Sequence, residues 1–267
     1  MVLHCAVFGS REMNASNKRW VVIFGGAGRE TCVERMLDEG VDVSAILVPK
    51  RRSAKLENSL RRLRNLGVTI IEVDKATLGS VLTPYAGLAL LSIGFPYLLD
   101  GELLKMFRPA LNLHPTMLPR YRGPTTAAYI LINGEKESGS TVHYMTADMD
   151  RGEILAQSSV SLNAFDTVRS LQRKVYATEP QLVMDAIAAL EAGVQPRPQD
   201  EGQASEFPKR RTPADSEIDP ARPLSALFNQ IRACDPDEFP AFFYHEGQKV
   251  CIRLWRPEKT TKEADEI

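Results

Sequence analysis

The residues of this sequence best suited to chemistry are an asparagine, a histidine and an aspartate. Asn112 and His114 lie two positions apart at the end of an apolar segment, and Asp150 follows in a short turn further along the chain. Residues two apart in a β-strand point to the same side, so the amide and the imidazole would share one face. An amide, an imidazole and a carboxylate at one site make a set suited to acyl transfer.

A histidine at a strand end is often only a well-packed core residue, and from the residues alone this alternative stays open. Two further features favour a functional site. Pro115 and Pro119 force the chain out of the strand and fix the loop 116–123. The turn Asp150-Arg151-Gly152 follows a strand-like segment, so its carboxylate is placed where it could orient the imidazole.

Strand-like and helix-like segments alternate over the first half of the chain. The apolar segments that predict strands are 21–24, 43–48, 68–73, 88–93 and 110–114. This alternation predicts an α/β fold, with a Rossmann-like, mostly parallel sheet and helices on both faces. Ligands of such sheets bind beyond the carboxyl ends of the strands, where Asn112 and His114 fall.

The second half of the chain is organised differently. We expect a helix over 125–133, a strand over 140–145, one long helix within 164–192 that Pro180 breaks or bends, a helix over 223–233 and a hairpin of 241–244 with 250–255. Proline, glycine and charged residues between 193 and 219 mark a linker. The sequence thus predicts a catalytic domain over 1–205 and a small C-terminal subdomain over 206–267. Residues 1–18 are interpreted as a loosely attached leader or a short first strand.

The composition limits the classes of function. The 267 residues are 43% hydrophobic and 25% charged, as in a globular protein. The 33 basic residues against 34 acidic ones give a net charge of -1, which predicts no bulk attraction to nucleic acid or membranes. Four cysteines without C-x-x-C spacing argue against a zinc site or a disulfide framework. We see no signal peptide or membrane-spanning run, so a cytoplasmic protein is expected.

Two other segments invite a functional interpretation. Gly25-Gly26-Ala27-Gly28 follows a strand, but Thr31 stands where a dinucleotide-binding motif needs a small residue, so a plain strand-to-helix turn is favoured. The segment 50–64 is strongly basic, with leucines at helical spacing. It is interpreted mainly as a solvated helix face, and binding of phosphate or RNA is the alternative.

The stretch from Asn112 to Gly123 has the form N-x-H-P-[ST]-x-L-P-x-[YW]-R-G, and a D-x-G turn follows it at Asp150. This pattern resembles the folate-dependent formyltransferase superfamily, strongly over 88–157 and loosely over the preceding sheet. Arg210-Arg211-Thr212-Pro213 and the segments 231–233 and 239–242 resemble the tail of amino-sugar formyltransferases. Among its members, the chain is most similar to the nucleotide-sugar N-formyltransferases.

The resemblance implies a role for specific residues. Asn112, His114 and Asp150 fall on the family's catalytic triad. The residues that fall on its two pterin-binding loops are Phe95, Tyr97, Leu98 and Leu99, then Thr146, Ala147 and Asp148. Pro96 departs from expectation because it removes one backbone donor. The implied co-substrate is N10-formyltetrahydrofolate, and no metal is required.

The resemblance leaves the amine acceptor open between a nucleotide-linked amino sugar, which is preferred, and initiator methionyl-tRNA. The tRNA enzymes have a long C-terminal barrel and a D-R-P-x-G-R-G-like loop, whereas this chain has a short tail and the loop Pro49-Lys50-Arg51-Arg52-Ser53. A glycinamide ribonucleotide acceptor and a binding module without activity are less favoured. The residues proposed to hold the acceptor are Thr116, Arg120, Tyr121, Arg122 and Gly123, with the 50–52 group as further phosphate ligands. A homodimer is expected.

Overall fold

The computed structural model describes residues 18–124, 126–207, 209–259 and 267. The expected leader or first strand at the N-terminus therefore lies outside the described residues, apart from Lys18. Among the helices in the described ranges, none is both long and apolar enough to cross a membrane.

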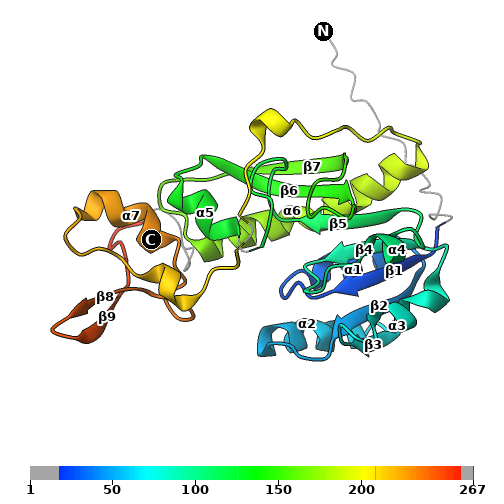
Figure 1. The fold of residues 1–267 in the computed structure, drawn as a ribbon, viewed down its shortest axis with the longest axis horizontal. Coiled ribbons are helices and arrows are strands. Elements are labelled where there is room, and N and C mark those ends of the chain that lie inside the picture. The colour runs from blue at the N-terminus through cyan, green and yellow to red at the C-terminus, as the bar shows by residue number, and fades with distance from the viewer. Residues whose placement is uncertain (1–17, 125, 208, 260–266) are drawn as a thin grey trace, which may run out of the picture.

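A seven-stranded sheet forms the centre of the molecule (Figure 1). Its strands, in the spatial order β3-β2-β1-β4-β5-β6-β7, are β1 (Trp20–Phe24), β2 (Val43–Pro49), β3 (Ile70–Val73), β4 (Ala89–Ile93), β5 (Ala110–His114), β6 (Glu137–Tyr144) and β7 (Ile154–Ser161). The first five pair in parallel, and β6 and β7 join antiparallel. The predicted mostly parallel α/β sheet is confirmed. Strand β7 was not expected, because its serines and glutamine give no apolar run.

Helices cover both faces of the sheet, as predicted. One face packs on α1 (Glu30–Asp38), α2 (Ala54–Arg64) and α6 (Val168–Glu191), the other on α3 (Leu78–Leu82), the 3₁₀ turn Thr83–Tyr85 and α4 (Gly101–Leu104). The reason is visible in β1, where Val22 and Phe24 enter the first core while Val21 and Ile23 enter the second. A strand buried on both faces is apolar at every position, which explains its continuous hydrophobic run.

The helix α6 runs unbroken through Pro180, so the predicted break there is wrong. Its start is fixed by a capping box, in which Thr167 and Ser170 each accept the other's backbone N–H. The half beyond the proline buries Leu182 and Val183 in the core on the sheet. Packing of this face outweighs the one backbone hydrogen bond that a proline removes.

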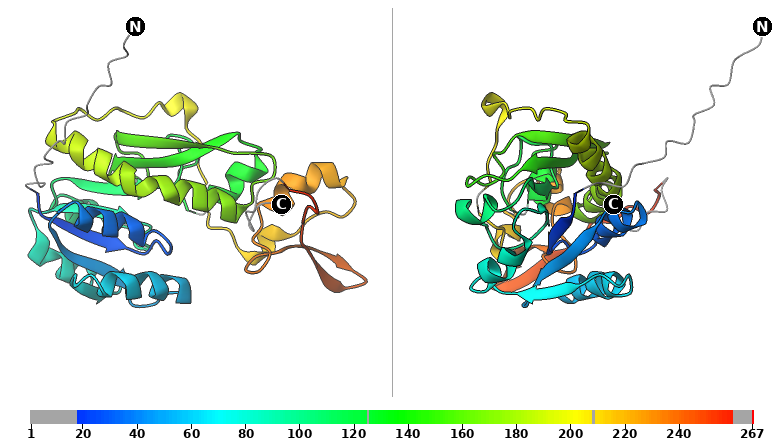
Figure 2. Two further views of the ribbon diagram at one scale, coloured as in Figure 1. Left: turned by 180° about the vertical axis from the view of Figure 1, so that it is seen from behind. Right: turned by 90° about the vertical axis from the view of Figure 1, so that its right-hand side faces the viewer.

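The C-terminal part lies at one end of the sheet region, at the left of Figure 1 and, in the view from behind, at the right of Figure 2. It comprises the 3₁₀ turn Pro213–Ser216, α7 (Leu224–Arg232) and a hairpin of β8 (Ala241–His245) with β9 (Gln248–Ile252), and α5 (Thr126–Ile132) faces it from the sheet region. The 3₁₀ turn Glu201–Gln203 lies at the top of the sheet region in Figure 1. The expected helix and hairpin are confirmed. They share a small core of Ile218, Leu227, Ile231, Cys234 and Ala241. The domain boundary at residue 205 stays a prediction.

Candidate active site

A cavity of about 690 Å³ opens at the carboxyl ends of β1, β4 and β5. Its walls are the loops that follow these strands and the loop 145–150 after β6. The loops after β1 and β4 touch backbone to backbone, since a Cβ on Gly94 would lie 2.9 Å from the Cα of Gly26. The glycine-rich turn therefore permits a close approach of two loops, in agreement with its interpretation as a structural turn.

Strand β5 delivers Asn112 and His114 to this cavity together. Leu111 and Leu113 alternate with them and enter the core on the side of α1 and α6. Both polar residues line the cavity, as does Asp150. The Oδ1 atom of Asp150 lies 3.6 Å from Nδ1 of His114. The structure thus brings the three predicted catalytic side chains to one place.

The hydrogen bonds of His114 fix which ring nitrogen is free. Its Nε2 lies 3.0 Å from the carbonyl oxygen of Tyr121, which can only accept, so Nε2 carries a hydrogen and donates it. In the neutral ring Nδ1 then lacks a proton and faces Asp150. The side chain is 7% exposed, so its orientation is set by these neighbours rather than by water.

Asp150 is held in place by a backbone hydrogen bond to its carboxylate and by the tight turn in which it lies. Its Oδ2 accepts a hydrogen bond of 2.9 Å from the backbone N–H of Gly123. Its φ of 57° lies in the left-handed region, which aspartate tolerates better than most residues. At Gly152, a Cβ would lie only 1.8 Å from the Tyr144 carbonyl oxygen, so the turn requires glycine there.

His143 is a residue of this site that the sequence interpretation missed. It lies opposite Asn112 in the antiparallel pair β5–β6, and its Nε2 lies 3.1 Å from Nδ2 of Asn112. Its Nδ1 donates to the Tyr144 carbonyl at 2.9 Å, so Nε2 accepts from the asparagine amide. Burial lowers the pKa of His143 to about 4, against the attraction of Asp150, which raises it. His143 is therefore neutral at pH 7 and orients the amide of Asn112.

Arg29 and Glu179 form a buried ion pair beside the cavity. The Nε and Nη2 atoms of Arg29 donate to the carboxylate at 2.6 and 2.7 Å, and Nη2 also lies 3.1 Å from the Leu113 carbonyl. The two side chains are 3% and 0% exposed, and Ser140 donates a further hydrogen bond to Glu179. This pair links the start of α1 and the middle of α6 to β5, at the residue that precedes His114.

All seven residues predicted to hold a pterin line the cavity: Phe95, Tyr97, Leu98, Leu99, Thr146, Ala147 and Asp148. They come from the two loops after β4 and β6. Phe95 and Tyr97 meet edge to face, with ring centroids 5.3 Å apart. Pro96 lines the cavity with them. An apolar, aromatic wall with a few polar groups suits a flat heterocycle.

The structure does not place the predicted acceptor-binding residues in the same way. Of the five, Gly123 lines the cavity, whereas Thr116, Arg120, Tyr121 and Arg122 do not. Thr116 is buried and donates to the Arg120 carbonyl, and Arg120 pairs with Glu135 and Glu137. Tyr121 donates to Glu135 at 2.7 Å and stacks on Phe207. The geometry supports no substrate contact for these four residues.

Arg122 instead supports the turn that carries Asp150. It is 2% exposed, pairs with Glu201 and donates to Oε1 of Gln199. Gln199 in turn donates from Nε2 to the carbonyl oxygens of Asp150 and Gly152, at 2.8 and 2.7 Å. Arg122 was expected to bind phosphate. In the structure its guanidinium holds Gln199, and Gln199 holds the turn that contains Asp150.

The 50–52 group lies away from this cavity as well. Lys50 pairs with Asp74, and Arg52 pairs with Glu57 and Glu72. The interpretation of this segment as a solvated face agrees with these pairs. Within the described residues, no group of three or more His, Cys, Asp or Glu side chains is placed to hold a metal ion.

Comparison with known proteins shows which proteins this chain is similar to. Residues 71–187 match the family described as formyl transferase. A glycinamide ribonucleotide transformylase from Symbiobacterium toebii is 29% identical, with a TM-score of 0.58 over 68% of this chain and 94% of its own.

Two further structures cover nearly all of the described fold. A sugar N-formyltransferase from Shewanella sp. has a TM-score of 0.71 at 20% identity, over 88% of this chain and 97% of its own. A 4-N formyltransferase from Francisella tularensis has a TM-score of 0.73 at 20% identity, over 89% and 97%. At this identity the likeness shows a common fold. Together with the family match over residues 71–187, it confirms the resemblance to formyltransferases seen in the sequence.

Proposed function

We propose that this protein transfers a formyl group from N10-formyltetrahydrofolate to the amine of a nucleotide-linked amino sugar. The observation that carries the proposal is the convergence of Asn112, His114 and Asp150 at the edge of a cavity whose wall suits a pterin. These are the groups that acyl transfer to an amine needs: a donor for the developing oxyanion, an acceptor for the amine proton and a carboxylate that stabilises the resulting charge.

Asn112 donates one amide N–H to His143, which leaves the second N–H of Nδ2 for the formyl oxygen. As the amine attacks, negative charge develops on that oxygen. A preorganised donor of this kind lowers the barrier by about 3–4 kcal/mol. Because His143 stays neutral, it accepts from Asn112 and keeps the amide from rotating.

His114 takes the proton of the attacking amine at Nδ1, since Nε2 is already protonated and bound to Tyr121. The bond from nitrogen to the formyl carbon forms, and the bond from that carbon to the N10 nitrogen breaks. Asp150 stabilises the imidazolium from 3.6 Å, and the same proton then passes to the departing N10 nitrogen. No metal is needed in this sequence of steps.

The choice of acceptor rests on two observations. The N-formyltransferase from Helicobacter canadensis, with a TM-score of 0.67 at 20% identity, was solved with folinic acid and dTDP-3-aminofucose. The basic segment that would otherwise suggest tRNA is largely paired with carboxylates, since Arg62 pairs with Glu30 and Glu34 in addition to the pairs of Lys50 and Arg52. This leaves little free positive charge for a polyanion.

A second copy of the chain is proposed to cover the C-terminal subdomain in a cytoplasmic homodimer. This subdomain exposes Leu224 of α7, Tyr244 of β8 and Trp255 beyond β9, at 70%, 55% and 75%. An isolated two-stranded hairpin is marginally stable, so an apolar partner surface would stabilise it. Light scattering at micromolar protein that gives the mass of one chain would contradict the dimer.

The test is a formyl-transfer assay with N10-formyltetrahydrofolate. The acceptors are a panel of nucleotide-linked 3-amino and 4-amino sugars, with initiator methionyl-tRNA beside them, and the His114→Ala protein is the control for contaminating enzyme. Transfer to one of the sugars supports the proposal. Transfer to the tRNA alone would refute the acceptor and keep the chemistry, and transfer to none of them would refute the proposal.

A further inference from the structure

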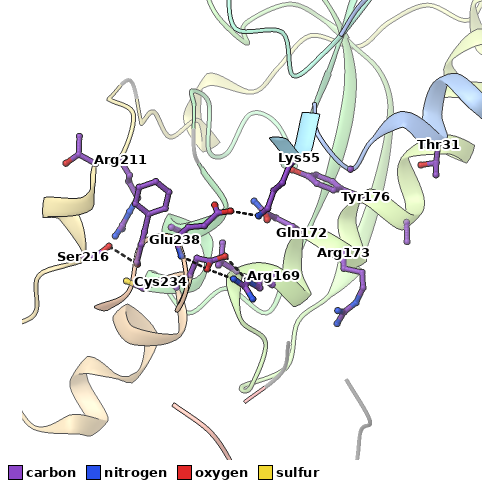
Figure 3. Close-up of a pocket in the computed structure, with 18 residues that line it drawn as sticks. Thr31, Lys55, Arg169, Gln172, Arg173, Tyr176, Arg211, Ser216, Cys234 and Glu238 are labelled. Carbon is purple, nitrogen blue, oxygen red and sulfur yellow. Dashed lines mark hydrogen bonds and ion pairs between the residues drawn. The ribbon is translucent and has the colours of Figure 1, made fainter. Parts of the chain in front are cut away.

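A second cavity, of about 620 Å³, lies between α6 and the C-terminal subdomain (Figure 3). One wall is the face of α6 that carries Arg169, Gln172 and Arg173, and the opposite wall comes from residues between 211 and 239. Lys55 of α2 reaches it from a third side. No residue of the catalytic set lines this cavity, and its size is that of a site for a small molecule.

The second cavity adjoins the first. Four residues line both of them: Ala128, Val168, Gln172 and Tyr176. These shared residues set the two cavities side by side. A long acceptor with a reactive amine at one end and a bulky recognition group at the other would use both.

The charges of the second cavity favour an anion. Four cationic side chains line it, Lys55, Arg169, Arg173 and Arg211, against the carboxylates of Asp235 and Glu238. Arg169 is bound by Asp235 and Asp237. Arg211 donates to the backbone carbonyl of Asp215 and lies over the ring of Tyr129. Arg210, its neighbour in sequence, lines the first cavity, so each of these two arginines faces one of the cavities.

We propose that the second cavity binds the nucleoside diphosphate portion of the acceptor, with Lys55 and Arg211 as ligands of the phosphates. This inference rests on the proposed function and assigns its recognition site. Lys55 is held by Glu238 at 2.5 Å, in a pair whose side chains are 67% and 47% exposed (Figure 3). A phosphate can replace the carboxylate at such an exposed ammonium with little rearrangement. Guanidinium and phosphate match in geometry, which suits Arg211.

Phe239 supplies an aromatic surface on which the base of a nucleoside can stack. Phe239 lines the cavity and is 45% exposed, so part of it is accessible to a ligand. A base can stack on such a ring. The cavity therefore offers phosphate ligands and a stacking surface together, and an inorganic anion would use only the first.

The test measures the binding of UDP, dTDP and GDP by calorimetry, to the wild type and to single variants of the full-length chain. Arg211→Ala and Lys55→Ala each should weaken the tightest of these ligands about tenfold. Glu238→Gln should strengthen it about twofold to threefold, because the competing carboxylate is gone. Phe239→Ala should weaken the nucleoside diphosphate and leave the binding of inorganic pyrophosphate unchanged. Arg222→Ala, an exposed arginine of the same subdomain that does not line the cavity, is the matched control.

The opposite response of Lys55→Ala and Glu238→Gln separates recognition from structure, because loss of a structural ion pair would weaken binding in both. If the ligand binds and these variants equal the wild type, the site assignment is wrong while the proposed function stands. If no nucleoside diphosphate binds, although 5-formyltetrahydrofolate does, the cavity assignment fails together with the acceptor class. Thermal unfolding of each variant shows whether it is folded.

Discussion

The two cavities differ in how their polar groups are held. In the first, His114 and His143 are buried and Asp150 is half-buried, and each is fixed by a hydrogen bond to the backbone. In the second, Lys55 and Arg169 are bound by carboxylates in exposed or half-exposed pairs. Groups that move protons must be positioned accurately, whereas groups that bind an anion must exchange one partner for another. Under the proposed function, the fold separates a rigid reaction site from an adaptable recognition site along one helix, α6.

The largest effect is expected from the rigid site. His114→Ala removes the acceptor of the amine proton and should lower kcat by about 10²–10⁴-fold. Asp150→Asn should lower it as well, because the amide cannot stabilise the imidazolium. The KM for the acceptor should change little in both, since neither residue lines the second cavity. Steady-state kinetics with an identified acceptor measure this.

The matched control for these two variants is Arg211→Ala, for which we expect a raised KM and a kcat close to that of the wild type. Binding of 5-formyltetrahydrofolate shows that the catalytic variants keep the first cavity. A near-normal kcat in His114→Ala and Asp150→Asn would contradict the assignment of catalysis to the first cavity and of acceptor binding to the second.

Two ion pairs of similar length, one beside each cavity, test the contrast between fixed and exchangeable groups through the free energy of unfolding. The Arg29–Glu179 pair is 2.6 Å long and buried, and the Lys55–Glu238 pair is 2.5 Å long and exposed. Glu179→Ala leaves a buried guanidinium without its carboxylate and should lower the free energy of unfolding by about 3–5 kcal/mol. Glu238→Ala should lower it by less than about 1 kcal/mol. Urea denaturation measures both, and equal losses would refute the contrast.

The sequence predicted those parts of the site that one strand or one turn carries by itself. The alternation of Asn112 and His114 with Leu111 and Leu113 is enough to place two polar side chains on one face. Their position at a strand end follows from the alternation of strands and helices. Local geometry suffices in such cases, because no partner from elsewhere in the chain is needed.

The parts that were missed depend on pairing between distant segments. His143 belongs to the site only because β6 runs antiparallel to β5 in a register that sets it opposite Asn112. Arg122 has the type and place of a phosphate ligand, and its true partners, Gln199 and Glu201, lie more than seventy residues away. The unbroken α6 shows the same point, since packing on the sheet decides it rather than Pro180.

The pH dependence of stability tests the burial of His143. Its pKa is about 4 in the folded protein and 6.5 in the reference state, so between these values the unfolded chain binds a proton that the folded one does not. Stability is therefore lost as the pH falls through this range. Between pH 7 and pH 5 the wild type should lose about 2 kcal/mol more than His143→Gln, whose amide does not titrate. Urea denaturation at the two pH values gives the difference.

Carboxylates elsewhere change stability with pH in both proteins, so only the difference between them reports on His143. If His143→Gln falls as steeply as the wild type, the histidine is charged in the folded protein. It would then not accept from Asn112, and the rigid site would lose the group that orients its amide.

The smallest expected effect concerns the helix that the two cavities share. Thr167 accepts the backbone N–H of Ser170 at the start of α6, one residue before Val168, which lines both cavities. Thr167→Ala should lower the free energy of unfolding by about 1 kcal/mol, because a helix N–H loses its acceptor. Thr167→Ser keeps the hydroxyl and should restore most of the loss. Because the rest of α6 is held by the sheet, kcat and KM should stay within about twofold in both variants. If Thr167→Ser loses as much stability as Thr167→Ala, the effect belongs to the methyl group that both variants lack. If the KM for the acceptor rises in Thr167→Ala alone, the first turn of α6 belongs to the adaptable site.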